Sequence, residues 1–352
     1  MTSSPETFST GVPVEIGHVD RELKKLWEAG GGVMTRASLM NLAVYSEEPS
    51  SLPANTQLIS KITEDHACRA IVISANRGAR ENRVEAWVSV HCHVGRAGGK
   101  QVCSEQLSFL LEGPCVNLLP SIVFSHLDSD LPFLLWWQGE FHDPMDPQLW
   151  AWVDRLLYDS QCWDDFDAQV RRVETAQAEA KQRVVLCDLN WTRIQHVRVA
   201  LAQFFDHPGS HHYFEEIERV EIDFAADYRS TAILLAGWLA AQMQWKATDK
   251  AKGHAISFSD RSGKSIEVRL RETAGEPIGR CLVVCQNTEF AVSHTENADL
   301  LDVTLATAGE KRMHQLMPAG ANDPVRLMTE ELNRGGPHRV YLRAVNCVRN
   351  LL

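Results

Sequence analysis

The sequence lacks the short motifs that mark several common classes of enzyme. GxGxxG, GxSxG, HExxH and CxxC are all missing from its 352 residues, so nothing points to a dinucleotide-binding turn, a hydrolase nucleophile or a zinc-binding helix. The segment RSGKS at 261–265 ends like a phosphate-binding loop. However, Phe258 stands where that loop needs a glycine, and the IEVRL that follows is typical of a strand. We therefore predict a hairpin turn there, and no catalytic residues in the chain.

Positive charge and long apolar runs are scarce. The chain has 35 lysines and arginines against 46 aspartates and glutamates, a formal net charge of −11. This argues against a general nucleic-acid binder and against docking to an anionic membrane, but not against a protein partner. The most apolar stretch, 231–243, is shorter than the roughly 20 residues of a membrane span and predicts a buried helix. The first residues lack a basic segment followed by an apolar one, which argues against a secretory signal.

The nine cysteines form no recognisable framework, since their number is odd and the chain is long. We expect reduced thiols in a cytoplasmic protein. Cys281 and Cys285 would share one face of a strand but lie about 13 Å apart, so we predict that they are not bonded to each other. His91 and His93 would lie about 7 Å apart on a strand, which suits zinc only with further ligands. No such ligands are recognisable by spacing, so we predict polar strand-end residues, no metal and no cofactor.

The first half of the chain predicts a layered α/β domain over residues 17–163, because helix and strand patterns alternate through it. The Ser-, Thr- and Pro-rich residues 1–16 are expected to be disordered. Apolar runs predict strands at 39–45, 70–75, 84–94 and 131–137. Helical spacing and end signals predict helices at 18–32, 55–69, 104–113 and 146–158.

The second half predicts a C-terminal α+β domain over residues 188–352, with a mostly antiparallel sheet and flanking helices. Before it, residues 164–187 are predicted to form an exposed connector helix, because the stretch is polar, acidic first and basic later. Helices are expected at 188–208, 229–245, 322–336 and near the C-terminus. Strands are expected at 219–224, 254–259, 264–270, 280–285, 290–295 and 302–307.

The segment FLLWWQGE at 133–140 places two tryptophans next to each other in a predicted strand. Side chains alternate between the faces of a strand, so Trp136 and Trp137 should point in opposite directions. The helix expected at 146–158 can cover only one of them. The other must meet a second layer of the same domain or the surface of another protein. We expect both rings to be core residues, with the loop after Gly139 available for contact.

Two stretches resemble the OpcA family, the glucose-6-phosphate dehydrogenase assembly proteins of cyanobacteria and actinobacteria. They are LPFLLWWQGE at 131–140 and LCDLNWTRIQHVRVALAQFFD at 186–206. IGHVDRELKKLWE, RASLMNLAVY, EDHACRAIVISA and SEQLSFLLEG fit the same pattern. The resemblance runs over about residues 16–350. Its most specific element is the ordered pair LP-x₃-WW-x-G and DLNWxR.

This resemblance implies a non-enzymatic accessory protein. Such a protein binds glucose-6-phosphate dehydrogenase, which opens the oxidative pentose phosphate pathway, and promotes the enzyme's active oligomer. Cyanobacterial relatives are linked to thioredoxin-dependent redox control. We do not carry this control over to the present chain, because no cysteine pair can be aligned residue by residue. Tryptophan and arginine are frequent at interface hot spots. The candidate partner-binding residues are Trp136, Trp137, Gly139, Asp188, Trp191 and Arg193. Trp191, at a helix start, is expected to be the most exposed of these tryptophans.

Two other classes of function remain open at this point. Arg193, near a helix start, could hold a phosphate together with free backbone N–H groups, which would make the chain a sugar-phosphate-binding regulator. The third class is an enzyme that acts on a sugar phosphate.

Overall fold

The computed structural model divides into two compact units. The first comprises Met1–Asp159, Ala168–Cys187 and Met328–Gly335, and the second comprises Ser160–Asp167, Asp188–Leu327 and Gly336–Leu352. The structure describes residues 11–29, 34–48, 50–94, 101–142, 146–179, 184–206, 208–248, 253–296, 298–308, 310–335 and 338–351. Within these ranges, no helix is both long and apolar enough to cross a membrane.

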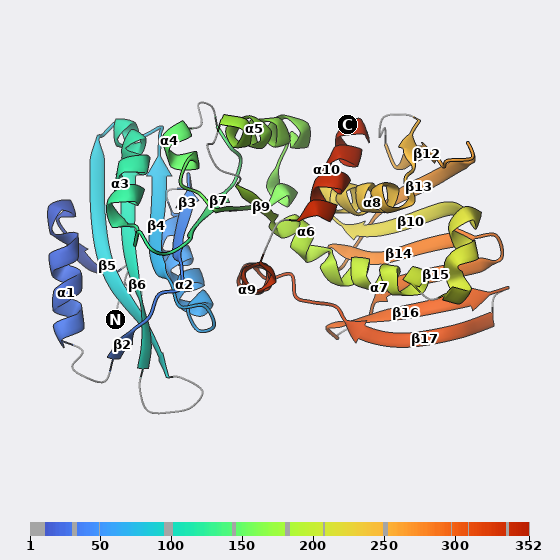
Figure 1. Cartoon of the computed structure of the whole chain (residues 1–352), viewed down its shortest axis with the longest axis horizontal. Coiled ribbons are helices and arrows are strands. Elements are labelled where there is room, and N and C mark those ends of the chain that lie inside the picture. The colour runs from blue at the N-terminus through green and yellow to red at the C-terminus, as the bar shows by residue number, and fades with distance from the viewer. Residues whose placement is uncertain are drawn as a thin grey trace, which may run out of the picture. The chain divides into compact units, whose positions relative to one another are not determined.

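The first unit is built on a sheet with a parallel centre (Figure 1). Nine strands are described, in the order β1-β5-β6-β4-β3-β7-β8-β9, with β2 paired to β6. The β6-β4-β3-β7-β8 pairings are parallel, whereas β1–β5 and β5–β6 are antiparallel. The strands are Val12–Val14 (β1), Met34–Arg36 (β2), Asn41–Ser46 (β3), Arg69–Asn76 (β4), Arg83–Val94 (β5), Gln101–Glu112 (β6), Phe133–Gln138 (β7), Arg155–Tyr158 (β8) and Val185–Asp188 (β9).

Helices cover this sheet and explain why its central strands are apolar throughout. Every residue of β3 is buried, as are all but the end residues of β4, which is typical of parallel strands covered on both faces. Helix α1 packs on β5, and α2 packs on β4. The helices of this unit are Val19–Ala29 (α1), Ser51–Ile62 (α2), Leu119–His126 (α3) and Pro147–Trp150 (α4), with most of Phe166–Glu179 (α5).

Two helix predictions in this unit are wrong. Residues 104–112 belong to strand β6, which pairs with β4 on one side and β5 on the other. The cap signal of Ser104 is overridden because both edges of the segment are bonded in the sheet. The helix expected at 146–158 stops at Trp150, and Arg155–Tyr158 forms β8 against β7.

The predicted N-terminal stretch and connector also differ from the structure. Residues 1–10 lie outside the described part, but Val12–Val14 pairs with β5, so the end of the stretch expected to be disordered is a strand. The predicted exposed connector at 164–187 contains α5 and most of β9. Val170 and Val173 of α5 are buried, and residues 168–187 belong to the first unit. The polar composition of the stretch concealed this narrow apolar face.

The second unit contains the mostly antiparallel sheet that was predicted. Eight strands are described, in the order β11-β12-β13-β10-β14-β15-β16-β17, and β10–β13 is the parallel pair among them. They are Lys246–Ala247 (β11), Ala255–Ser259 (β12), Ser265–Thr273 (β13), Ile217–Ala225 (β10), Ile278–Cys285 (β14), Thr288–His294 (β15), Leu300–Thr307 (β16) and Glu310–Pro318 (β17). The sequence did not predict β11 or β17. The RSGKS segment is the β12–β13 turn, as predicted, with Gly263 at φ +88°.

Helices α7 and α8 pack against this sheet, and α10 packs on α8 (Figure 1). The register aligns Val220, Val283 and Phe290 across three strands, and Phe290 contacts Phe204 and Phe205 of α7. The apolar stretch 231–243 lies in α8 and is buried over most of its length, as predicted. The helices are Leu189–Arg193 (α6), Gln195–Asp206 (α7), Arg229–Met243 (α8), Pro324–Arg334 (α9, shared with the first unit) and Arg339–Leu351 (α10).

One disulfide corrects the expectation of reduced thiols. Cys92 of β5 and Cys103 of β6 are paired directly across the two strands and are bonded, with their Cα atoms 4.1 Å apart. Cys281 and Cys285 are both free, as predicted. Burial raises the pKa of each of these two thiols to about 12, so both stay protonated near neutral pH.

Close packing of α8 on α10 depends on Gly237. A Cβ atom at this position would lie 2.5 Å from Val348 Cγ2 and 3.0 Å from the backbone oxygen of Ala344. The glycine therefore lets two helices approach more closely than any side chain would allow.

We expect Gly237→Ala to lower the free energy of unfolding by about 1–3 kcal/mol, because overpacking outweighs the roughly 1 kcal/mol of helix propensity that alanine adds. Urea denaturation measures the change. Gly17→Ala is the matched control, since nothing lies within 4 Å of its added Cβ, and it should be neutral. A Gly237→Ala protein as stable as the wild type would contradict this account of the packing.

Candidate functional site

The tryptophan pair of β7 lies inside the first unit. Trp136 is 4% exposed and Trp137 is 6% exposed, so neither ring is available to a partner at the surface. β7 runs between β3 and β8, which places both residues in the middle of the sheet. Both rings are therefore buried, as expected from the sequence.

Trp137 belongs to an aromatic cluster that closes over the end of β7. Its ring lies 4.2 Å from that of Tyr45 and 5.4 Å from that of Phe141, and its indole N–H donates to the Glu140 carbonyl at 3.0 Å. Phe141 also contacts Trp150 and Tyr158. The cluster fixes the chain that leaves the strand.

Gly139 makes the turn that returns the chain to this cluster. It is exposed and has φ +88°, a conformation that side-chain-bearing residues rarely adopt. Phe141 lies two residues after Gly139, and its backbone N–H donates to the side-chain oxygen of Gln169 at 2.8 Å. Of the candidate residues Trp136, Trp137 and Gly139, only Gly139 thus lies at the surface.

The second candidate stretch, DLNWTR, is organised by the buried carboxylate of Asp188. Asp188 caps α6 and accepts from the Asn190 backbone N–H at 2.9 Å. It also accepts from the backbone N–H and the hydroxyl of Ser160, at 3.0 and 2.7 Å, and from the Tyr341 hydroxyl at 3.1 Å. Asp188 is 1% exposed, so these donors replace the water that its charge would otherwise need.

Asn190 extends this network toward α8. Its amide donates to the Ser160 hydroxyl at 3.1 Å, and its carbonyl oxygen accepts from the Thr231 hydroxyl at 2.6 Å and from Arg193 at 3.0 Å. Asn190 and Thr231 are fully buried. The polar residues of the motif are therefore mostly used inside the second unit.

Trp191 and Arg193 differ in their exposure. Trp191 is buried, with the Arg198 guanidinium 3.4 Å above its ring and the Tyr341 ring 5.5 Å away. Arg193 is half-buried, and its Nε donates to Asn322 at 2.7 Å while its guanidinium lies over Tyr228. The prediction that Trp191 is the most exposed of the candidate tryptophans is wrong, because Tyr341 and Arg198 cover it.

The start of α6 offers little to a phosphate group. The helix has five residues, and the Asn190 N–H in its first turn is already bonded to the Asp188 carboxylate. A carboxylate at that position repels a second anion. Arg193, which the sequence suggested as the phosphate-binding residue, is bonded to Asn190 and Asn322.

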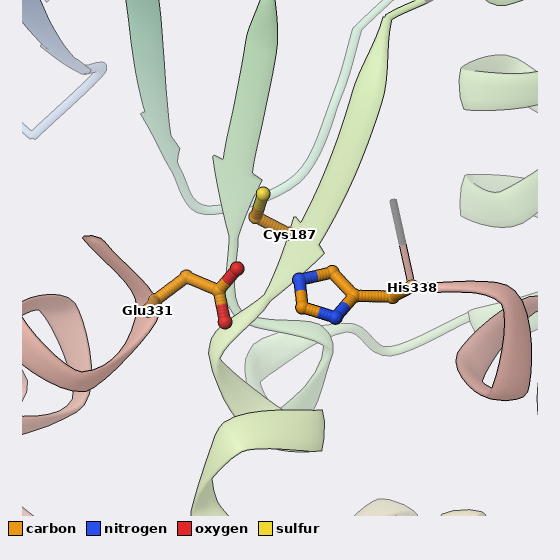
Figure 2. A group of neighbouring side chains, drawn as sticks. All are labelled: Cys187, Glu331 and His338. Carbon is orange, nitrogen blue, oxygen red and sulfur yellow. The ribbon is translucent and has the colours of Figure 1, made fainter. Parts of the chain in front are cut away.

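An ion pair in the first unit was missed from the sequence. Arg155 of β8 donates to the Glu331 carboxylate at 3.0 Å and to its backbone oxygen at 2.9 Å, and Glu331 is fully buried. The two residues are 176 positions apart, so no local pattern signals the pair. Figure 2 shows Glu331 with Cys187, both from the first unit; His338, also drawn, belongs to the second.

Cys187 is a poor nucleophile in this environment. Burial and, to a smaller degree, the charge of Glu331 raise the pKa of its thiol to about 12.

The histidines singled out as a possible zinc pair have protein partners: His91 bonds Gln106 at 2.8 Å, and His93 bonds Thr63 at 3.2 Å. Burial lowers the pKa of His91, which keeps it neutral near pH 7.

Two family models match the chain in order. The model described as the glucose-6-phosphate dehydrogenase subunit N-terminal domain matches residues 59–175, and that for the C-terminal domain matches residues 184–345. The chain belongs to the OpcA family, whose members are named as glucose-6-phosphate dehydrogenase assembly subunits.

Curated relatives agree with this assignment. A protein of Nostoc punctiforme with the provisional name OxPP cycle protein OpcA is 24% identical over 231 residues, or 63% of this chain and 48% of its own length. The protein of the same name from Synechocystis is 22% identical over 226 residues, or 62% of this chain and 46% of its own length. The chain thus matches about half the length of these curated relatives.

Solved structures with similar architecture are oxidoreductases. The aldose-aldose oxidoreductase of Caulobacter crescentus is 9% identical, with 88% of this chain and 94% of that one covered at a TM-score of 0.48. The UDP-N-acetylglucosamine 3-dehydrogenase GnnA of Acidithiobacillus ferrooxidans is 8% identical, with 90% and 97% covered at a TM-score of 0.44. Likeness at this level carries no inference about activity.

Because both tryptophans of β7 are core residues, we expect Trp136→Ala and Trp137→Ala each to cost about 3–5 kcal/mol of unfolding free energy. Thermal melting should show a sharp decrease for both. Trp152, which is 63% exposed, provides the control, and Trp152→Ala should melt close to the wild type. Unchanged melting in either β7 variant would show that its ring is not structural.

The hydrogen-bond network predicts coupling between Asp188 and Tyr341. Tyr341→Phe removes one donor and should cost about 1–2 kcal/mol, whereas Asp188→Ala leaves several buried donors without their acceptor and should cost about 3 kcal/mol or more. The double variant should cost less than the sum, because both changes remove the same bond. Urea denaturation of all four proteins measures this. Strictly additive costs would mean that the bond contributes nothing.

Proposed function

We propose that the chain is a non-enzymatic accessory protein that binds glucose-6-phosphate dehydrogenase in the cytoplasm and promotes its active oligomer. The observation that carries this proposal is the ordered match of two family models, both described as glucose-6-phosphate dehydrogenase subunit domains. The names of the curated relatives, which refer to the oxidative pentose phosphate cycle, support the same pathway.

Activation in this proposal is a difference between two binding affinities. An accessory protein shifts its partner toward an active state only if it binds that state more tightly. A hundredfold preference corresponds to about 2.7 kcal/mol, which a few well-placed contacts supply. A surface that exists only in the assembled dehydrogenase would give this preference directly, since the separate subunits would not present it.

Within this proposal, the family motifs have two roles. Trp136, Trp137, Asp188 and Trp191 are buried and would shape the two units rather than touch the dehydrogenase. Gly139 is exposed, and Arg193 is half-buried, so these two remain as contact candidates from the motifs. The sugar-phosphate alternative is not favoured, because Asp188 occupies the helix start that would bind the phosphate.

Three functions can be separated with purified components. We expect the chain and the dehydrogenase from the same organism to co-elute from a sizing column without added ligand, and the dehydrogenase rate to rise as the chain is titrated. Co-elution that requires glucose 6-phosphate would favour the sugar-phosphate regulator. Turnover of a sugar phosphate by the chain alone would favour an enzyme. Separate elution with no change in rate would contradict the proposal.

A further inference from the structure

The first unit exposes one tryptophan that packing does not explain. Trp152 follows α4 and precedes β8, and 63% of its surface is exposed, whereas the neighbouring Trp150 is 3% exposed. Within the described residues, its indole N–H donates no hydrogen bond, unlike that of Trp137. Exposed tryptophan is costly in water and is the residue type most enriched at interface hot spots.

Trp152 forms the edge of an apolar hollow. Its ring lies 5.9 Å from that of Phe124 on α3 at an angle of 52°, so the two rings make a corner. The hollow beside them has a volume of about 460 Å³ and lies wholly in the first unit. Its apolar lining comes from Phe124, Leu127, Leu131, Phe133 and Trp152. An open space of this size accepts one or two large apolar side chains from a partner.

Carboxylates border this hollow and carry uncompensated charge. Asp128 and Asp154 line it, and the exposed Asp130 follows Asp128 in the same loop. Each lining carboxylate accepts one backbone N–H, Asp128 from Asp130 at 3.4 Å and Asp154 from Phe133 at 2.8 Å. Within the described part of the chain, none of the three forms an ion pair. The rim is therefore acidic and free to meet cations.

We propose that the surface formed by Phe124, Asp128, Trp152 and Asp154 docks a segment of glucose-6-phosphate dehydrogenase that presents an apolar side chain flanked by lysine or arginine. The apolar side chain fills the hollow against the two rings, and the basic residues pair with the rim. The charge of the rim selects a basic partner over a neutral one. This inference depends on the proposed function, since it assigns the contact surface for the same partner.

The central test is the affinity of Trp152→Ala for the purified dehydrogenase, measured by titration of the full-length chain. We expect the Kd to rise about 30-fold or more, as for a hot-spot residue, with a melting temperature close to that of the wild type. Trp152→Phe should recover most of the affinity, because it restores an aromatic ring. Leu316→Ala is the matched control, since Leu316 is 53% exposed on β17 of the second unit and should bind like the wild type.

The acidic rim has its own test. Asp128→Asn with Asp154→Asn keeps an oxygen for each backbone N–H but removes both charges. We expect the Kd to rise about threefold to tenfold and the dependence of binding on salt to become weaker.

Three outcomes would overturn the assignment. They are wild-type affinity in Trp152→Ala, equal losses in Trp152→Ala and Leu316→Ala, or an unchanged salt dependence in the rim variant. A wild-type chain that does not bind the dehydrogenase at all would instead refute the proposed function, so the two failures are distinguishable.

Discussion

The buried carboxylate of Asp188 is the interaction on which the second unit's motif depends. It accepts from Ser160, 28 residues earlier, and from Tyr341, 153 residues later, while it caps the helix that follows it. A carboxylate inside a protein is stable only when such donors replace its water. Three distant segments must therefore be in place before the charge is satisfied. The local structure of the DLNWTR stretch thus depends on the correct folding of the second unit.

This constraint changes how the family motifs are understood. Tryptophan and arginine in a characteristic order suggest a binding surface, but Trp136, Trp137 and Trp191 are all internal. A motif can identify a family because it fixes the scaffold, and the recognition surface then depends on residues outside it. Trp152 shows the difference, since only two positions separate it from the buried Trp150.

Much of the fold follows from sequence patterns, and the errors have identifiable physical causes. Strands buried on both faces, such as β3 and β4, are predictable because a short, continuous apolar run is typical of them. The segment 104–113 carries helix-end signals at Ser104 and Gly113, yet pairing on both edges makes residues 104–112 a strand. That error also concealed the disulfide, because Cys103 is placed opposite Cys92 only when both segments are strands of one pair.

Contacts between distant segments set the limit of prediction from sequence. The cap by Asp188 was predictable, since the residue lies directly before a helical pattern. Its bond to Tyr341 and the Arg155–Glu331 pair were not, because each joins residues more than 150 positions apart. Within the motifs, residue types indicated candidates for partner contact, but only the packing shows which of them are internal.

Charge and apolar contact would contribute differently to recognition by this chain. The formal net charge of −11 and the acidic rim act over about a Debye length and accelerate the encounter with a basic surface. They discriminate weakly between conformations of a partner, because many arrangements of lysine and arginine satisfy them. An aromatic corner beside a hollow is more selective, since its contacts form only when a matching side chain is correctly placed, and it acts mainly on dissociation. If the chain favours one oligomeric state of its partner, that preference should therefore come from the apolar contact rather than from the charge.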